Sequence, residues 1–181
     1  MVVDGKTLTS DAIQSLRVRV ETASYMQGAG EYHTHDIKEV YIQKILANIH
    51  LNRKLKVAVD CGNGVAGDIA PELFRRLGCD VLELYCDVDG NFPNHHPDPS
   101  RPENLADLIS LLAESDAEIG LAFDGDGDRL GVVTKDGNII YPDRQMMLYA
   151  QDVLLHNPQS KIIFDVKSSR LLAPWIIKHG G

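Results

Sequence analysis

The sequence has 181 residues, of which 44% are hydrophobic and 24% charged, with a formal net charge of −8 at pH 7. That length supports one good hydrophobic core, or one core with pieces of neighbouring domains. An acidic chain without a lysine/arginine cluster excludes nucleic acid as an expected partner. No apolar run approaches the ~20 residues that span a bilayer, and no secretory leader is recognisable. We therefore expect no membrane association and a cytoplasmic location.

The first 35 residues are expected to form a turn, a helix and a linker. Asp4-Gly5 is a turn sequence, and a helix capped by Thr9 or Ser10 should follow it. Its apolar stripe consists of Ala12, Ile13, Leu16 and Val20. Residues 21–35 are polar and contain two glycines, which favours a linker.

The next segment is expected to form a helix and then a parallel strand pair. Asp36 can cap a helix that runs to about His50. Residues 56–60 and 79–86 are strand candidates, and the helix expected at 67–77 would connect them as a βαβ unit. The three cysteines are odd in number and form no CxxC motif, which favours buried, reduced thiols: Cys61, Cys79 and Cys86.

The glycines of this segment also match a nucleotide-binding pattern. Gly62, Gly64 and Gly67 have the Gly-x-Gly-x-x-Gly spacing of a dinucleotide-binding turn, and Glu83 is a candidate for the acid that would bind the ribose. Alone this motif is a weak signal. Nucleotide binding is therefore the less favoured hypothesis.

Residues 87–101 form a proline-rich segment that is unsuited to a helix or a strand. His95 and His96 lie here with Asp98, so a functional histidine pair is one hypothesis. A rigid loop that supports the following acidic loop is the favoured alternative, because prolines fix loop geometry. A helix is expected from Pro102 to about Glu114.

The most informative stretch of the chain is a cluster of carboxylates between two apolar runs. Residues 119–123 and 130–133 are expected to be buried strands, and they enclose Asp124, Asp126 and Asp128. Three like charges this close require a compensating cation, and Mg²⁺ prefers oxygen ligands of this kind. The intervening glycines reach φ > 0 and would let the loop curl. A plain surface turn is the disfavoured alternative, and an EF-hand fails because its sixth position would be Arg129 rather than glycine.

Arg129 completes the charge balance of this loop. Three aspartates, one divalent cation and one arginine sum to zero, so further ligands would be water or a phosphate oxygen. A guanidinium is well shaped to hold a phosphate.

The last part of the chain should continue as α/β structure. A strand end at 139–141 precedes a helix that starts at Pro142, whose methionines are expected to lie in the core. A buried strand is expected at 161–166, leading into Lys167. Anions bind where such strands end, so Lys167 is a candidate anion contact, with a solvated lysine as the alternative.

At this point a resemblance becomes specific. Residues 124–129 (Asp-Gly-Asp-Gly-Asp-Arg) resemble the metal-binding loop of the α-D-phosphohexomutases, in particular the bacterial phosphomannomutase/phosphoglucomutase branch. Further segments match in the family's order: 59–67, 89–99 and 164–167. The resemblance implies an α/β/α layered domain with a mixed, mostly parallel sheet, flanked by partial neighbouring domains. It also explains the glycines at 62–67 as tight strand-to-helix packing.

The resemblance implies a division of the chain into three parts. Residues 1–35 would be the tail of a first domain with a linker, 36–137 a second domain with the metal loop, and 138–181 the start of a third. Ser24 is not expected to be the family's phosphoserine, because Tyr25 departs from the motif. We expect an internal piece of a mutase, inactive without the remaining domains.

The implied activity is Mg²⁺-dependent phosphoryl transfer between O1 and O6 of glucose or mannose phosphates, through a phosphoserine enzyme and a bisphosphate intermediate. In this scheme the three aspartates bind Mg²⁺, and Arg129 is a catalytic residue that stabilises phosphate. Lys167 and, more weakly, Arg144 would contact the substrate.

Two other functions fit the same carboxylates. An aspartyl-phosphate phosphatase would use Asp124 as nucleophile and Asp126 as acid/base. A non-catalytic metal-binding module would bind the cation without any chemistry of its own.

Overall fold

The computed structural model describes residues 2–181, which divide into two units, the residues up to Asp36 and Ile37–Gly181. In the first unit, β1 (Val2–Val3) pairs antiparallel with β2 (Lys6–Thr7) and is followed by α1 (Ser10–Glu21). The hairpin turns at Asp4-Gly5, where both φ angles are positive, as two-residue hairpin loops require. These elements confirm the predicted turn and helix. The apolar stripe of α1 is not buried, and the predicted cap makes no side-chain hydrogen bond.

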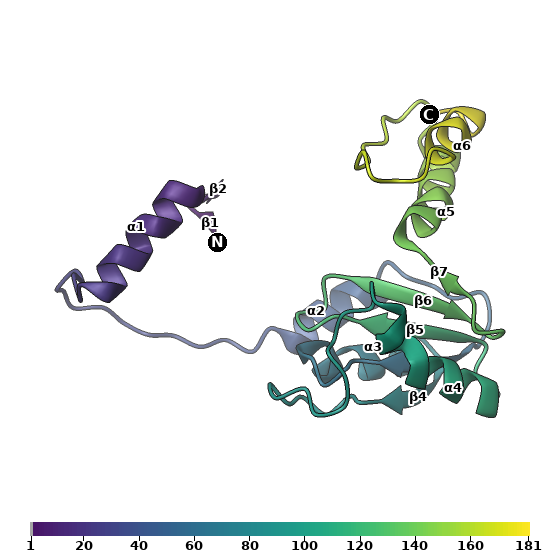
Figure 1. Ribbon diagram of the computed structural model, residues 1–181, viewed down its shortest axis with the longest axis horizontal. Coiled ribbons are helices and arrows are strands. Elements are labelled where there is room, and N and C mark those ends of the chain that lie inside the picture. Colours follow the sequence, from purple (N-terminus) through teal and green to yellow (C-terminus); the bar gives the residue numbers. More distant parts are fainter. Residues whose placement is uncertain (1) are drawn as a thin grey trace. The chain divides into compact units, whose positions relative to one another are not determined.

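The second unit is built on a five-stranded sheet with the order β4-β3-β5-β6-β7 (Figure 1). The strands are β3 (Lys56–Asp60), β4 (Asp80–Leu84), β5 (Ile119–Phe123), β6 (Leu130–Thr134) and β7 (Ile139–Ile140). β3 is parallel to β4 and β5, whereas β6 is antiparallel to β5 and β7. The sheet is therefore mixed, as predicted, but half of its pairings are antiparallel. The loops 124–129 and 135–138 are short, and short loops can join only antiparallel strands.

Helices pack on both faces of this sheet, which confirms the layered α/β architecture. Val57 and Val59 of β3 face Ala70 of α3 (Ala70–Arg76), while Ala58 faces Leu108 of α4 (Ala106–Glu114). This alternation follows from the two-residue period of a strand. The helices predicted at 67–77 and 102–114 are each preceded by a 3₁₀ turn, η1 (Val65–Asp68) and η2 (Pro102–Leu105).

α4 lies directly on the backbone of β5. A Cβ on Gly120 would lie 2.9 Å from Leu112 Cδ1 and 3.0 Å from Leu108 Cγ, so a larger residue would force these leucine side chains to shift. Buried contacts of this kind fix the position of β5. The carboxylate loop begins where β5 ends.

α2 (Lys38–Leu46) corrects two predictions. Its N-cap is Ile37, not Asp36, and it ends at Leu46, not His50. Ion pairs join its first turn to other elements, since Lys38 Nζ lies 3.1 Å from Asp68 Oδ1 and Arg76 Nη1 lies 2.8 Å from Glu39 Oε2.

α5 (Pro142–His156) starts at Pro142 as predicted and packs beside α6 (Leu172–Lys178), beyond β7 in Figure 1. The strand predicted at 161–166 is wrong. The segment has no regular structure, and Ile163 and Val166 are 91% and 96% exposed. A strand requires a partner for its backbone groups, and nowhere in residues 2–181 does a strand pair with this segment.

The three cysteines are free thiols, as predicted, with Cys61 and Cys79 buried and Cys86 half-buried. None of the helices formed by residues 2–181 has the length and apolar character needed to cross a membrane. The unit Ile37–Gly181 spans the proposed boundary at residue 137, so the division into second and third domains stays a prediction.

Candidate metal centre

The carboxylate loop closes the hairpin between β5 and β6. Phe123 pairs with Leu130, so residues 124–129 form the whole connection. The loop is ordered by its own backbone, because the Asp124 amide donates to the Arg129 carbonyl at 3.3 Å and the Gly127 amide donates to the Asp124 carbonyl at 3.1 Å. The antiparallel hydrogen bonding of β5 and β6 thus extends to the pair Asp124 and Arg129, and the turn of the loop lies between them.

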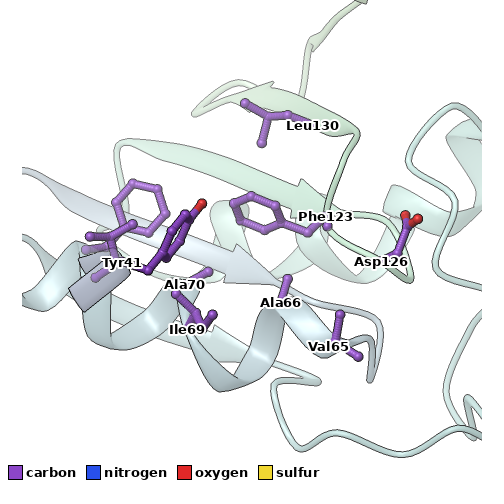
Figure 2. A pocket seen from close by; sticks show the side chains of 11 residues that line it. Tyr41, Val65, Ala66, Ile69, Ala70, Phe123, Asp126 and Leu130 are labelled. Atoms are coloured by element: carbon purple, nitrogen blue, oxygen red, sulfur yellow. The ribbon is translucent and has the colours of Figure 1, made fainter. Parts of the chain in front are cut away.

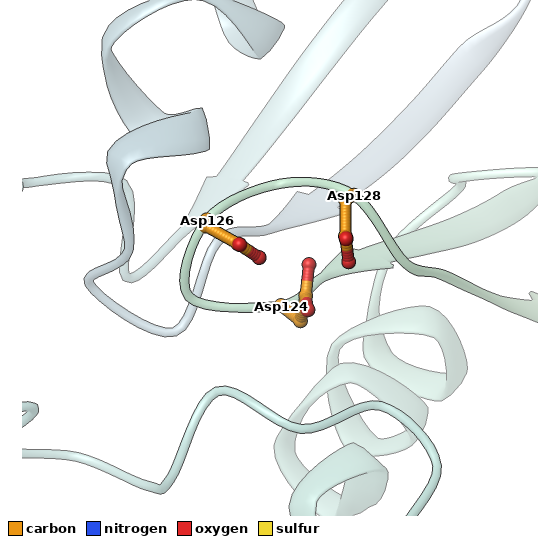
Figure 3. Close-up of side chains that lie close together, drawn as sticks. All are labelled: Asp124, Asp126 and Asp128. Atoms are coloured by element: carbon orange, nitrogen blue, oxygen red, sulfur yellow. The ribbon is translucent and has the colours of Figure 1, made fainter. Parts of the chain in front are cut away.

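The curl brings the three predicted ligands together (Figure 3). One carboxylate oxygen from each of Asp124, Asp126 and Asp128 lies within 4.8 Å of the others. Asp124 is buried and the other two are exposed. The convergence expected from the sequence is therefore present.

The two glycines of the loop have different tasks, which corrects the prediction that both supply φ > 0. Gly127 has a φ of +75°, so it makes the turn. Gly125 has no positive φ, but a Cβ there would lie 3.3 Å from Pro97 Cγ. Gly125 is needed for close packing.

Asp124 is held by Arg129 at both oxygens. The Arg129 amide donates to Oδ1 at 2.9 Å, and its Nε donates to Oδ2 at 2.6 Å. Burial alone would raise the pKa of Asp124, but these hydrogen bonds and the guanidinium charge bring that pKa below its ordinary value. Asp124 is therefore ionised and fixed before any cation arrives.

Asp128 is in the opposite electrostatic situation. The negative charges of Asp126 and then Asp124 raise the pKa of Asp128 above its ordinary value. Like charges at this spacing disfavour one another's ionised forms. A cation at the centre of the loop would remove that repulsion.

These opposite shifts predict opposite effects of substitution on stability without metal. The pKa of Asp128 is raised in the folded protein, so ionised Asp128 opposes folding once the pH exceeds the pKa that Asp128 has in the unfolded chain. Asp128→Asn should therefore raise the Tm at pH 7. The pKa of Asp124 is lowered in the folded protein, so ionised Asp124 stabilises the fold at any pH above the pKa that it has in the unfolded chain. This contribution is lost as the pH falls through the pKa of Asp124 in the folded protein. Asp124→Asn should therefore destabilise, by about 1–3 kcal/mol from its charge-assisted hydrogen bonds.

Thermal melts at pH 7 in the presence of a chelator test this contrast. The reverse order of the two melting temperatures would contradict the assigned electrostatics. Repeating the melts at pH 2 should shrink both differences, because the wild-type carboxylates are then being protonated.

Arg129 has a partner that sequence reasoning missed. Its Nη1 donates to Asp98 Oδ1 at 3.1 Å, although its side chain is 58% exposed. Asp98 is thus a fourth carboxylate at the site. Four carboxylates, one divalent cation and Arg129 leave one uncompensated negative charge, whereas the count from the sequence gave zero. Two of the guanidinium nitrogens are engaged, and donors remain for a phosphate. Its role as a catalytic residue stays a prediction.

The loop is clamped from two sides at Gly125. Its amide donates to the Pro97 carbonyl at 3.2 Å, and its carbonyl accepts from the Val65 amide at 3.1 Å. A Cβ on Gly64 would lie 2.9 Å from the same carbonyl oxygen. The contact of Pro97 confirms the prediction that the proline-rich loop supports the acidic loop.

The Gly-x-Gly-x-x-Gly spacing is explained by packing. Gly62 has a φ of +48° and faces Pro97, Gly64 faces Gly125, and Gly67 faces the Cys86 carbonyl. In each case a neighbouring part of the protein occupies the space where a Cβ would lie. The geometry supports tight turn packing over a nucleotide site.

Arg144 and Lys167 lie together, but not in the carboxylate loop. Both line a shallow hollow with Tyr141, Pro142, Asp143, Asp165 and Ser168. Lys167 is 86% exposed, and its Nζ lies 3.8 Å from Asp165 Oδ2. A second hollow, lined in part by Asp128 and Arg129, shares Tyr141 and Pro142 with the first. The candidate anion contacts and the metal loop therefore border neighbouring hollows.

An apolar pocket borders the other side of the loop (Figure 2). It lies between α2, α3 and the edge of the carboxylate loop, and its lining includes Tyr41, Phe123 and Leu130. Asp126 is the one acidic residue in this lining. Asp126 therefore lies at the edge of an apolar pocket, while Asp128 and Arg129 line the hollow on the other side.

Comparisons with known proteins identify relatives of this chain. The model of the family "Phosphoglucomutase/phosphomannomutase, alpha/beta/alpha domain II" matches residues 39–137. A phosphoglucomutase of Neisseria gonorrhoeae is 59% identical, and a phosphomannomutase/phosphoglucomutase of Pseudomonas aeruginosa PAO1 is 55% identical, each over the whole of this chain. The chain spans 40% and 39% of the lengths of these relatives.

A solved structure extends the comparison to the fold. The crystal structure of a phosphoglucomutase/phosphomannomutase family protein from Burkholderia thailandensis superposes with a TM-score of 0.94 at 56% identity, covering all of this chain and 40% of that one. A structure described as a putative phosphomannomutase from Thermus thermophilus, at 20% identity, shares the fold with a TM-score of 0.68.

Proposed function

Because the chain belongs to the phosphoglucomutase/phosphomannomutase family, we propose that it is part of a phosphohexomutase, an isomerase that moves a phosphoryl group between O1 and O6 of a hexose phosphate. Its substrates would be the 1- and 6-phosphates of glucose or mannose, with a bisphosphate intermediate. The observation that carries the proposal is the convergence of Asp124, Asp126 and Asp128 at the end of β5. The phosphoserine and the remaining substrate contacts would come from the rest of the longer enzyme.

The donor set of the loop fits Mg²⁺. Three carboxylate oxygens within 4.8 Å of one another are hard ligands on one side of an ion, leaving room for water or phosphate on the other. When bound, Mg²⁺ would neutralise charge on the phosphoryl group during its transfer. Asp124 needs no rearrangement to take part, because Arg129 already holds it in its ionised form.

The chain's own cations would position the phosphate groups. Arg129 lies beside the carboxylates with part of its guanidinium exposed, where it can donate to a phosphate. Lys167 and Arg144 line the neighbouring hollow and would hold the sugar phosphate. Positioning and charge stabilisation supply most of the catalysis in phosphoryl transfer.

The geometry disfavours an aspartyl-phosphate phosphatase. A nucleophilic Asp124 would lose its negative charge on forming an acyl phosphate, and with it the strength of its two hydrogen bonds from Arg129, whereas a metal ligand keeps both. Treatment of the phosphorylated longer enzyme with hydroxylamine separates the two mechanisms. An acyl phosphate would be cleaved and a phosphoserine would survive.

The metal part of the proposal predicts that Asp126→Asn abolishes or strongly weakens Mg²⁺ binding. Asp126 is exposed and supports no other part of the fold, so the fold should be unaffected. Calorimetric titration of this chain with Mg²⁺ measures the effect. Asp136→Asn is a matched control, because Asp136 is an exposed aspartate on the β6–β7 turn. Equal binding by all three proteins would remove the argument from convergent carboxylates.

The proposal also covers domain organisation and location. Residues 1–35 would end a first domain, 36–137 would form the second and 138–181 would begin a third. The enzyme's other domains would be its partners. The three free thiols support a reducing, cytoplasmic compartment.

A further inference from the structure

Asp60 is a buried acid outside the carboxylate loop. It ends β3, and its side chain is 1% exposed. Burial raises the pKa of Asp60, opposed by a hydrogen bond from the Gly62 amide at 2.9 Å and by His95. His95 Nε2 lies 3.3 and 3.1 Å from the two Asp60 oxygens. A buried carboxylate is tolerated only with such partners.

His95 faces hydrogen-bond acceptors at both ring nitrogens. Its Nδ1 lies 3.0 Å from the His96 carbonyl oxygen, and its Nε2 faces Asp60. A carbonyl oxygen and a carboxylate can both accept, so Nδ1 can donate to His96 and Nε2 can donate to Asp60. His95 therefore joins the buried carboxylate at the end of β3 to the backbone of its own loop.

The residues after His95 connect this pair to the metal loop. The Pro97 carbonyl accepts from the Gly125 amide, and Asp98 accepts from Arg129. A Cβ on Gly62 would lie 2.9 Å from Pro97 Cβ and 3.0 Å from His95 Cε1, so the segment is pressed against the end of β3. A displacement of His95 would therefore also displace the Pro97 carbonyl and Asp98, which hold the loop at Gly125 and Arg129.

We propose that the Asp60–His95 pair positions the metal loop and thereby sets its affinity for a divalent cation. The inference rests on the metal role proposed above. The hydrogen bonds between His95 and Asp60 hold segment 95–98 against the end of β3. Without them the Pro97 carbonyl and Asp98 are held less firmly against the loop.

A second side chain packs against His95 besides Asp60. The other ring facing His95 is Tyr85, edge-on at 5.5 Å between centroids. Its hydroxyl donates to Asp107 Oδ2 at 2.9 Å, and this bond raises the pKa of Tyr85, which keeps it neutral. The negative charge of Asp107 also raises the pKa of Asp60.

The test compares Mg²⁺ affinity at pH 7 in the wild type, His95→Gln and His96→Gln. His96 is the matched control, because it is exposed and its ring meets Phe92 rather than Asp60. We expect His95→Gln to bind Mg²⁺ about tenfold more weakly at pH 7, the cost of one hydrogen bond to a buried group. We expect His96→Gln to bind Mg²⁺ as tightly as the wild type does.

Hydrogen exchange of the Gly125 amide supplies a readout that needs no metal. It should be about tenfold faster in His95→Gln than in the control, because its acceptor on Pro97 is no longer held. If the wild type binds no Mg²⁺, the proposed metal function fails, while this exchange rate still tests the positioning. Unchanged exchange together with an unchanged Mg²⁺ affinity would overturn the inference. If His95→Gln does not fold, Asp60→Asn takes its place, because it removes the charge that His95 meets. Unchanged Gly125 exchange in that variant would then overturn the inference.

Discussion

Gly67→Ala should strongly destabilise the protein, by more than about 3 kcal/mol, although it adds only one methyl group. A Cβ at this position would meet the Cys86 carbonyl oxygen well inside van der Waals contact, and would lie 2.8 Å from its carbon and 3.1 Å from the Cys86 Cα. All three atoms are backbone, so no side-chain rotation can relieve the clash. Small domains have about 5–15 kcal/mol of stability, and a loss of this size is a large share of it.

The clash also affects the connection on which the site depends. Gly67 lies in η1, between the end of β3 and α3, and its amide donates to the Gly64 carbonyl at 3.1 Å. Moving η1 would move Gly64 away from the carbonyl of Gly125. Urea denaturation followed by circular dichroism measures the effect. Gly90→Ala is the control, because a Cβ there would meet nothing within 4 Å and its φ is not positive. Equal midpoints for the two variants would contradict the packing argument.

The second large effect concerns activity. In the longer enzyme, Lys167→Ala should lower kcat/KM for glucose 1-phosphate by about a hundredfold, as expected for the loss of one charged contact that orients a phosphate. The Tm should hardly change, because Lys167 is 86% exposed and its one described ion pair, to Asp165 at 3.8 Å, is a surface contact.

Lys161→Ala is the matched control for this experiment. It removes an exposed lysine of the same irregular segment, outside the hollow that Lys167 lines. A coupled assay for glucose 6-phosphate formation gives the kinetic constants, and thermal melts give the stability. A large loss of stability with normal kinetics would make Lys167 structural. Equal kinetic losses in both variants would indicate a general electrostatic effect.

Local sequence patterns were sufficient for most of the sheet. β3, β5 and β6 are short apolar runs bounded by polar loops, and each lies at or close to its expected residues. The carboxylate site was predictable for the same reason, because its three ligands are close in sequence on a single hairpin loop. Neither conclusion required knowledge of distant contacts.

The errors concern features that depend on distant parts of the chain. Residues 161–166 are apolar enough for a strand, but strand formation is decided by a pairing partner. The first turn of α2 is held by ion pairs with Asp68 and Arg76, which the local sequence pattern at Asp36 does not reveal. The contacts of Asp98 with Arg129 and of Asp60 with His95 join residues 31 and 35 positions apart. No local spacing rule could have found them.

The unequal support of the three carboxylates has a consequence for ion selectivity. Asp124 is fixed by two hydrogen bonds from Arg129, whereas Asp126 and Asp128 are exposed and free to adjust. Discrimination by ionic radius requires a rigid cage, and here two of three ligands can move outward to accept a larger ion. The loop should therefore accept Mn²⁺ and Ca²⁺ with affinities near that for Mg²⁺, as parallel titrations would show. Any preference for Mg²⁺ during turnover would then have to come from the geometry of the phosphate it contacts.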